Sequence, residues 1–286
     1  MRLSSRILLS ASLLLSLPAV AHAFDGGGWT VHPHEWYSEF SASRTYANAI
    51  FLPDARDQAI PPAGTGRFQQ FEVHSYNEIG WRRNVSLLLD VPFVDRTWRL
   101  DQTTLGVSGL SDMRLGLRVR LREDAPGLIL EGGWRAPLGY DQAVFPRLGD
   151  GRQKAWVALH GGYVLPNVPA FVQASRGFLY IGTDAVLLSQ TTVDGGFWIG
   201  SNVLVGGRYA DQLGWNAAQS ARTLETYYTA GPFLLMRVED HMDVSIGAMR
   251  NLYGRNSLEG TQVYAALGLK QSKLNPLQGF LGSKLH

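Results

Sequence analysis

The 286-residue sequence contains no cysteine, so the chain has neither a disulfide framework nor a cysteine for a lipid anchor. It also has no uninterrupted apolar stretch after residue 23 of the about 20 residues that a transmembrane helix needs. No segment after residue 23 shows the i, i+3, i+4, i+7 spacing of an amphipathic helix. These absences exclude a disulfide-stabilised domain and a protein that crosses a membrane with helices, and they point away from a helical fold.

Residues 1–23 have the pattern of a secretory signal peptide. Arg2 and Arg6 precede an apolar run from Ile7 to Leu17, and Ala21–Ala23 (AHA) has the small-x-small form of a cleavage site. The apolar run is too short to span a bilayer as a helix. We therefore expect cleavage after Ala23 and export of the rest of the chain.

The chain also lacks an excess of charge of one sign. Its formal net charge is +2, and removing Arg2 and Arg6 with the signal peptide leaves 24 of the 26 basic residues, equal to the 24 acidic residues. No run of Lys and Arg and no basic stripe with interleaved aromatic residues is present. The charge pattern therefore does not indicate a nucleic acid partner.

What the chain does have is strict alternation of apolar and other residues, which is typical of β-strands. Each alternating segment has close to the about 10 residues that a tilted strand needs to cross a membrane. Such strands cross a bilayer only in a closed barrel, where every backbone polar group finds a partner. The fold class that we predict is all-β, a transmembrane antiparallel up-and-down β-barrel of about 12 strands. The predicted strands are Glu35–Thr45, Phe68–Gly80, Val85–Trp98, Leu110–Leu121, Leu128–Leu138, Lys154–Leu165, Ala170–Ile181, Leu188–Ile199, Val203–Ala210, Thr223–Val238, Met242–Tyr253 and Thr261–Lys270.

The connections between these strands alternate between short and long, which is typical of outer-membrane barrels with periplasmic turns and extracellular loops. A secreted β-sandwich would need polar residues on its outer faces, where this chain stays apolar strand after strand. We therefore predict an outer-membrane location, with the lipid bilayer and the outer-membrane assembly machinery as partners. The predicted short connections are 80–84, 122–127, 166–169, 200–202 and 238–241, and the long ones are 46–67, 99–109, 139–153, 182–187, 211–222 and 254–260.

These predictions divide the chain into four parts. They are a signal peptide (1–23), a short N-terminal segment (24–34), the barrel (35–270) and a C-terminal tail (271–286).

The segment Asp112–Asp124 (DMRLGLRVRLRED) shows the alternation most clearly. Its odd-numbered positions from Met113 to Leu121 are apolar and are expected to face lipid, whereas four arginines share the other face. That face is expected to line a wet lumen, and carboxylates at inward positions of neighbouring strands would offset the positive charge. The resulting candidates for a constriction of the lumen are Arg114, Arg118, Arg120, Arg135, Asp90, Glu131 and Glu78.

Motifs for catalysis or for metal binding are weak. The HGG sequence at His160–Gly162 is similar to the oxyanion loop of lipases, but no G-x-S-x-G nucleophile motif accompanies it. His32 and His34 have no third candidate ligand nearby, and no H-E-x-x-H, P-loop or dinucleotide fingerprint is present. We therefore predict no catalytic residues, no metal and no cofactor.

An ordered set of short motifs between residues 26 and 165 resembles a known family. The motifs are GGGWT, EIG, LLLDVPF, SGLSDMRLGLRVRL, APLGYD and PRLGDG. In this order they are similar to the outer-membrane barrels assigned to transport in the phenol meta-degradation pathway, which are distantly similar to long-chain fatty-acid channels. The resemblance implies passage of small hydrophobic or aromatic solutes through the barrel. Two alternatives stay open, a sealed barrel with a structural or adhesive role and an outer-membrane enzyme of the lipase or deacylase type with its site at the rim.

Overall fold

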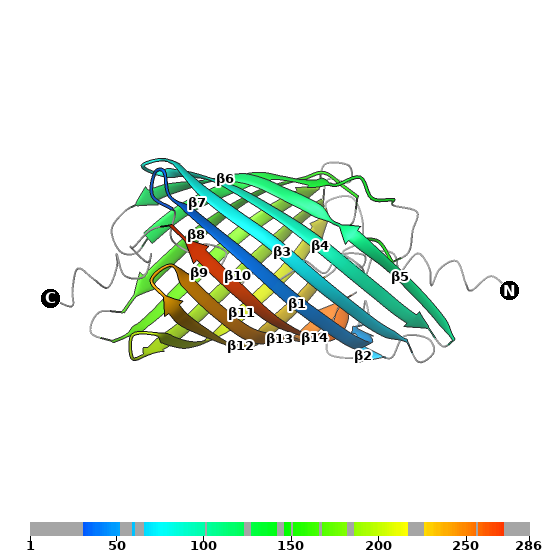
Figure 1. Cartoon of the computed structure of the whole chain (residues 1–286). Helices are drawn as coiled ribbons and strands as arrows, with labels where there is room; N and C mark the ends of the chain where they lie inside the picture. Colours follow the sequence, from blue (N-terminus) through cyan, green and yellow to red (C-terminus); the bar gives the residue numbers. More distant parts are fainter. Residues whose placement is uncertain are drawn as a thin grey trace.

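The computed structural model describes residues 31–51, 59–60, 66–100, 102–122, 127–141, 146–149, 151–165, 168–181, 186–216, 226–255 and 257–271. None of these residues belongs to a helix long and apolar enough to cross a membrane. The predicted signal peptide and the tail beyond Gln271 lie outside this part of the chain, so both stay predictions. The described strands, shown in Figure 1, are β1 (Trp36–Phe51), β2 (Ala59–Ile60), β3 (Arg67–Arg82), β4 (Val85–Leu100), β5 (Thr103–Leu110), β6 (Asp112–Arg122), β7 (Gly127–Pro137), β8 (Lys154–Val164), β9 (Ala170–Ile181), β10 (Val186–Ile199), β11 (Val203–Asn216), β12 (Thr226–Glu239), β13 (Met242–Arg255) and β14 (Leu258–Lys270).

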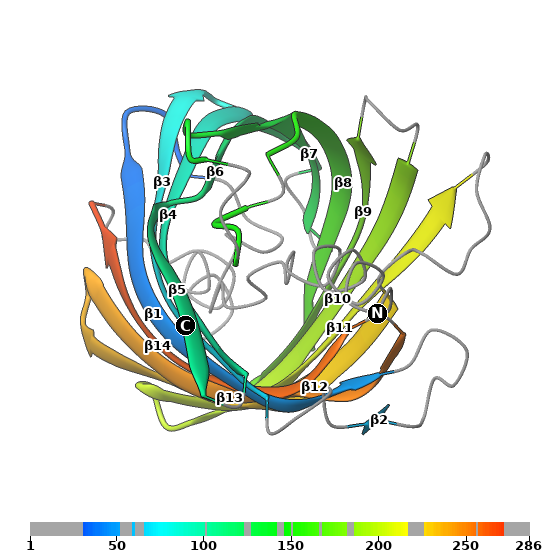
Figure 2. The same cartoon turned by 90° about the vertical axis from the view of Figure 1, so that its right-hand side faces the viewer.

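Twelve of the described strands form one closed antiparallel barrel: β1, β3, β4 and β6 to β14. Each pairs with its neighbour in chain order, and the ring closes where β14 pairs with β1 from Tyr37↔Lys270 to Ile50↔Leu258. Figure 2 shows the ring from one end. The prediction of an all-β, up-and-down barrel of about twelve strands is confirmed.

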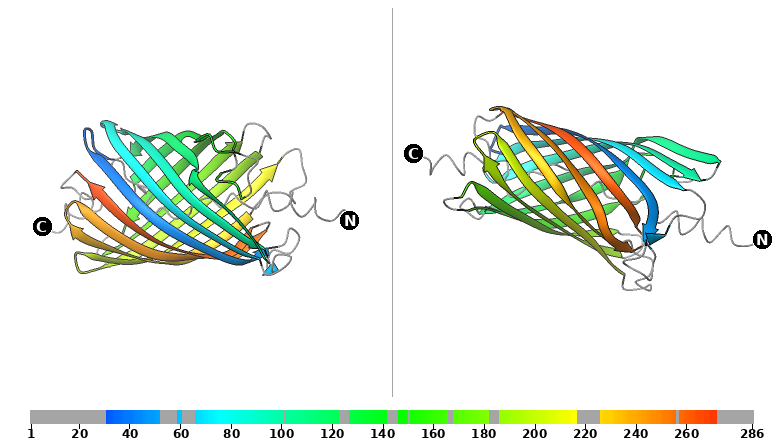
Figure 3. Two further views of the ribbon diagram at one scale, coloured as in Figure 1. Left: turned by 45° about the vertical axis from the view of Figure 1, so that its right-hand side comes forward. Right: turned by 90° about the horizontal axis from the view of Figure 1, so that it is seen from below.

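The long connection predicted at 99–109 contains a strand that was not predicted. β4 continues to Leu100, and β5 pairs with it from Thr103 to Leu110, so the two strands form a hairpin that projects past the neighbouring strands (Figure 3). Other strands also continue into segments predicted as long loops, since β1 reaches Phe51 and β11 reaches Asn216. Pairing between strands therefore continues beyond the segments predicted as strands, because backbone hydrogen bonds do not require apolar alternation.

The two faces of the barrel wall have the opposite character from those of a soluble protein. Outward side chains are large, apolar and exposed, such as Leu115 and Leu117 on β6 and Ile246 on β13. Inward positions carry many buried polar groups, and β3 alone places Gln70, Glu72, His74, Tyr76 and Glu78 inside. This arrangement fits lipid outside the wall and a filled, largely polar lumen.

The N-terminal segment that precedes β1 turns across the inner side of β3. The backbone N–H of Val31 donates to Glu78 Oε1 at 3.2 Å, and that of His34 donates to the carbonyl of Gly80 at 2.9 Å. A Cβ atom at Gly80 would overlap the carbonyl oxygen of His32. Glycine at position 80 therefore allows two backbones to lie against each other at this end of the barrel.

Replacing Gly80 with alanine is expected to push the segment Val31–Glu35 away from β3. We expect a loss of about 1–3 kcal/mol in the free energy of unfolding, as for other overpacked sites, measured by urea unfolding of the refolded protein. Gly161→Ala is the control, because its added Cβ would have no atom nearer than 3.9 Å. An equal change in the free energy of unfolding for both substitutions would show that the close contact at Gly80 does not limit which residue fits there.

Candidate functional site

Among the residues that the structure describes, Arg118 on β6 carries the most deeply buried charge in the lumen, with its side chain 0% exposed. Its Nη1 lies 2.9 Å from Glu78 Oε2 on β3, and its Nε lies 3.5 Å from Glu131 Oε2 on β7. Glu78 also accepts a hydrogen bond from Ser86 on β4. Side chains from four neighbouring strands therefore meet around one guanidinium group, and its desolvation is offset by two carboxylates.

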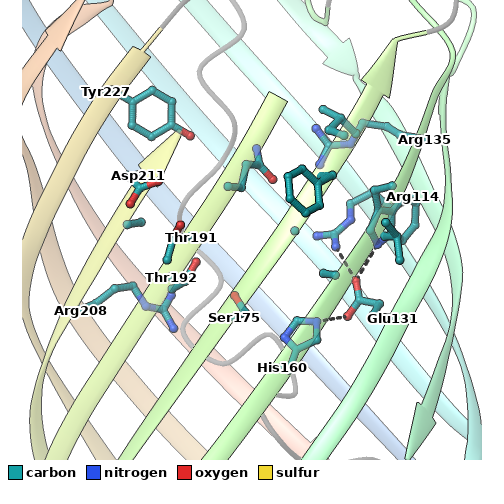
Figure 4. Close-up of a pocket in the computed structure, with 18 residues that line it drawn as sticks. Arg114, Glu131, Arg135, His160, Ser175, Thr191, Thr192, Arg208, Asp211 and Tyr227 are labelled. Atoms are coloured by element: carbon teal, nitrogen blue, oxygen red, sulfur yellow. Dashed lines mark hydrogen bonds and ion pairs between the residues drawn. The ribbon is translucent and has the colours of Figure 1, made fainter. Parts of the chain in front are cut away.

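Glu131 is the centre of a second set of contacts, drawn in Figure 4. Arg114 Nη2 and Trp156 Nε1 donate to its Oε1 at 3.0 and 2.9 Å, and His160 Nε2 lies 3.2 Å from its Oε2. The guanidinium carbon of Arg114 also stacks 5.0 Å from the centroid of the Trp156 ring. Because all of these partners surround one carboxylate, loss of Glu131 would leave several buried donors without their acceptor.

His74, which the sequence analysis did not single out, links two further carboxylates to this region. Its Nε2 lies 3.0 Å from Glu72 Oε1 and its Nδ1 lies 3.0 Å from Asp90 Oδ1. Asp90 also lies 3.9 Å from Arg114 Nη1, so it joins the two groups of charges. The sequence does indicate that His74 faces inward, because His74 follows Glu72 by two residues on the same strand and their side chains therefore point to the same face.

The structure brings five of the seven predicted residues into one connected set, namely Arg118, Glu78, Glu131, Arg114 and Asp90. The other two flank this set. Arg135 is paired in register with Arg114 on the adjacent strand, and Arg120 lies opposite Ile129 nearer the short turn. We call the five connected residues together with His74 and His160 the lumen network. That the lumen network forms a constriction stays a prediction.

On another part of the inner wall, Arg208 and Asp194 form a buried bidentate pair. Nε and Nη2 of Arg208 lie 2.6 and 2.9 Å from the two carboxylate oxygens of Asp194, and Gln173 donates to Asp194 at 2.7 Å. The alternation of residues 203–210 predicts that the side chain of Arg208 faces inward. Its partner was missed, because the cross-strand register that joins Asp194 to Arg208 depends on how β10 and β11 pair.

A cluster of large apolar side chains also lies inside the barrel, on β9 to β14. We call it the apolar cluster, and it comprises Phe171, Trp198, Leu204, Phe233, Leu235, Met249, Tyr264 and Ala266. Both kinds of buried side chain, charged and apolar, occur around the wall, since Arg208 and Asp194 lie on two strands of this cluster, and Leu88 and Ile129 are buried on strands of the lumen network.

A cavity of about 120 Å³, shown in Figure 4, lies along the inner wall between the lumen network and Arg208. It is smaller than the about 300–1,000 Å³ of pockets that hold drug-sized ligands, so it suits a small solute. Among the described residues, no group of three or more His, Asp or Glu side chains is placed to hold a metal ion. The residues lining the cavity are Arg114, Glu131, Arg135, Trp156, Val157, Ala158, His160, Ser175, Gly177, Phe178, Leu179, Gln190, Thr191, Thr192, Arg208, Ala210, Asp211 and Tyr227.

Comparison with known proteins gives matches only among solved structures. No protein-family model matches the sequence, and no curated protein matches it. The COG4313 outer membrane channel from Pseudomonas putida F1 has a TM-score of 0.69 and 10% sequence identity, over 86% of this chain and 98% of that chain. The translocator domain of the autotransporter NalP from Neisseria meningitidis has a TM-score of 0.51 and 8% identity, over 84% and 90% of the two chains.

The chain has the fold of an outer-membrane β-barrel. At 8–10% identity these structures establish the fold alone. One of them is a channel and the other a translocator domain, so function has to be argued from the lumen of this barrel.

Proposed function

We propose that this barrel lies in the outer membrane and is a channel for small hydrophobic or aromatic solutes. The observation that carries the proposal is the apolar cluster inside the barrel. An apolar wall lowers the cost of taking an apolar solute out of water, whereas a uniformly polar lumen gives no such gain. The lipid bilayer and the outer-membrane assembly machinery are the partners that this proposal implies.

Two resemblances support the proposal. The sequence motifs between residues 26 and 165 are similar to those of transporters of the phenol meta-degradation pathway, which favours an aromatic solute. The barrel also has the fold of the P. putida channel over most of both chains.

One observation favours the alternative of a sealed barrel. Arg118 is completely buried, and its ion pairs with Glu78 and Glu131 hold β3, β6 and β7 together across the inner wall. If these contacts never open, the lumen network closes the barrel and the protein has a structural or adhesive role.

Single-channel conductance of the refolded mature chain in planar bilayers separates the two functions. We expect discrete conductance steps, and we expect Arg114→Ala to change their size and to shift selectivity toward cations, because Arg114 lines the cavity and is 15% exposed. Arg250→Ala is the control, since the Arg250 side chain is 65% exposed, lies 3.5 Å from Glu259 and does not line the cavity. Folded, heat-modifiable protein without conductance steps would instead establish the sealed barrel.

A further inference from the structure

The connection between β7 and β8 enters the barrel. Its described residues 146–149 have no regular secondary structure, yet Pro146 is fully buried and Leu148 is only 6% exposed. Seen along the barrel in Figure 2, described parts of this connection, in green, lie inside the ring of strands. A connecting segment usually runs over the surface, where water satisfies its backbone groups. A buried segment needs protein partners instead.

The inner wall supplies those partners. Arg96, an inward residue of β4, donates from Nη1 to the carbonyl of Arg147, and its Nε donates to Gln70 on β3 at 2.7 Å. Ser111, between β5 and β6, donates to the carbonyl of Leu148 at 2.5 Å. Because β6 separates β4 from β7 in the wall, the segment reaches past β6 to make these contacts.

Asp112, the first residue of β6, holds the base of the segment. Its Oδ1 accepts a hydrogen bond from the Tyr140 hydroxyl, which in turn accepts one from the backbone N–H of Gly151 at 2.6 Å. Lys154 Nζ, at the start of β8, lies 3.5 Å from Asp112 Oδ2. A Cβ atom at Gly149 would overlap both the Tyr140 hydroxyl and the Asp112 carboxylate, so glycine at this position allows the close contact.

We call Asp112, Tyr140 and Lys154 the latch. It lies on the side of the cavity that faces the long connections, because Asp112 precedes the cavity residue Arg114 by two residues on the same face of β6. Lys154 is likewise in register with Arg135, which lines the cavity. Three of the sequence motifs meet here, since SGLSDMRLGLRVRL contains Asp112, APLGYD contains Tyr140, and PRLGDG contains the buried segment.

We propose that residues 146–149 are a lid that closes the lumen between the long connections and the cavity, and that the latch sets how often this lid opens. Opening breaks the hydrogen bond between Tyr140 and Asp112 and exposes the carbonyls of the segment to water. The barrel wall can stay in place, because Asp112 and Lys154 are the first residues of their strands. This inference rests on the proposed channel function, to which it adds a gate.

Because the chain contains no cysteine, one introduced thiol can report on the lid. In Leu148→Cys the thiol is buried while the lid is closed, so a bulky charged maleimide reacts with it only when the lid opens. Tyr140→Phe removes both hydrogen bonds of the hydroxyl. Added to Leu148→Cys in the full barrel folded in detergent micelles, it is expected to raise the labelling rate about tenfold, which corresponds to about 1.4 kcal/mol.

Tyr180→Phe is the matched control, because Tyr180 is 48% exposed on β9 and lies outside the latch. It is expected to change the labelling rate by less than about twofold, as surface substitutions have small effects.

A reversible disulfide tests the effect of the lid on conductance. The Ser111 side chain contacts the backbone of Leu148, so Ser111→Cys together with Leu148→Cys is expected to form a disulfide in oxidised glutathione. In planar bilayers we expect conductance steps to disappear on oxidation and to return on reduction, whereas Ser111→Cys alone responds to neither. If the thiol variants do not fold, Gly149→Ala provides the test, since overpacking at the latch is expected to lengthen open times at least about fivefold. Gly161→Ala is its control.

The outcomes separate the lid from the channel function. Equal labelling rates with Tyr140→Phe and Tyr180→Phe, conductance unchanged by the disulfide, or equal open times for Gly149→Ala and Gly161→Ala would overturn the lid and leave the channel function in place. Faster labelling with Tyr140→Phe in a barrel that conducts in no variant, oxidised or reduced, would instead overturn the channel and with it the role of the segment as a gate.

Discussion

Leu117→Arg is expected to prevent most of the refolded protein from inserting into lipid vesicles. Leu117 lies near the middle of β6 with its side chain 44% exposed on the outer face. An arginine at the midplane of the bilayer costs about 2–4 kcal/mol on the lipid side of a barrel. The inserted fraction is measured by the mobility shift on heating and by resistance to protease after refolding into vesicles.

The control for Leu117→Arg places the same side chain on the other face of the wall. Ser175 on β9 lines the cavity, so Ser175→Arg puts a guanidinium into the lumen rather than into lipid. We expect this variant to insert like the wild type. Equal insertion of both variants would show that the assignment of the inner and outer faces is wrong.

Glu131→Gln is expected to lower the free energy of unfolding by about 3–5 kcal/mol, the cost of removing one partner from a buried ion pair. Glu131 accepts contacts from Arg114, Trp156 and His160 and lies 3.5 Å from Arg118, which is completely buried. The amide of glutamine keeps the shape but carries no negative charge. Urea unfolding of the folded barrel, followed by tryptophan fluorescence, measures the change.

An exposed ion pair on the same barrel gives the comparison. Arg250 Nη2 lies 3.5 Å from Glu259 Oε1, with side chains 65% and 34% exposed. Exposed pairs contribute about 0–1 kcal/mol, because water and salt screen them, so Glu259→Gln is expected to change stability by no more than that. If Glu131→Gln changes stability equally little, the lumen network does not hold the inner wall together.

Much of the fold could be predicted because the alternation of β6 is a local property. From Met113 to Leu121 the chain itself shows which side chains face lipid and which face the lumen, and the structure confirms that Leu117 is outside and Arg118 inside. The hairpin of β4 and β5 was missed because its local pattern is brief. Only Leu105 and Val107 alternate with Gly106 and Ser108 in this segment, too few residues to predict a strand over 103–110.

The candidate site could be predicted only in part. Parity placed Glu78, Arg118 and Glu131 inside the barrel, and the structure shows them in contact. His74 and Asp194 were missed as ion-pair partners, because their contacts with Asp90 and Arg208 depend on side-chain reach across the pairing of two strands.

The all-β class, the approximate number of strands and the faces on which side chains such as Leu117 and Arg118 lie could be derived from the chain, because successive residues of a strand point to opposite faces. Which inward groups meet depends instead on how the strands pair in the closed barrel. Arg118 and Glu78 are 40 residues apart in the chain and come together through the pairing of β3, β4 and β6. The cavity likewise exists because small residues such as Ala158 and Gly177 from adjacent strands occupy the same part of the closed wall, where their side chains leave space unfilled.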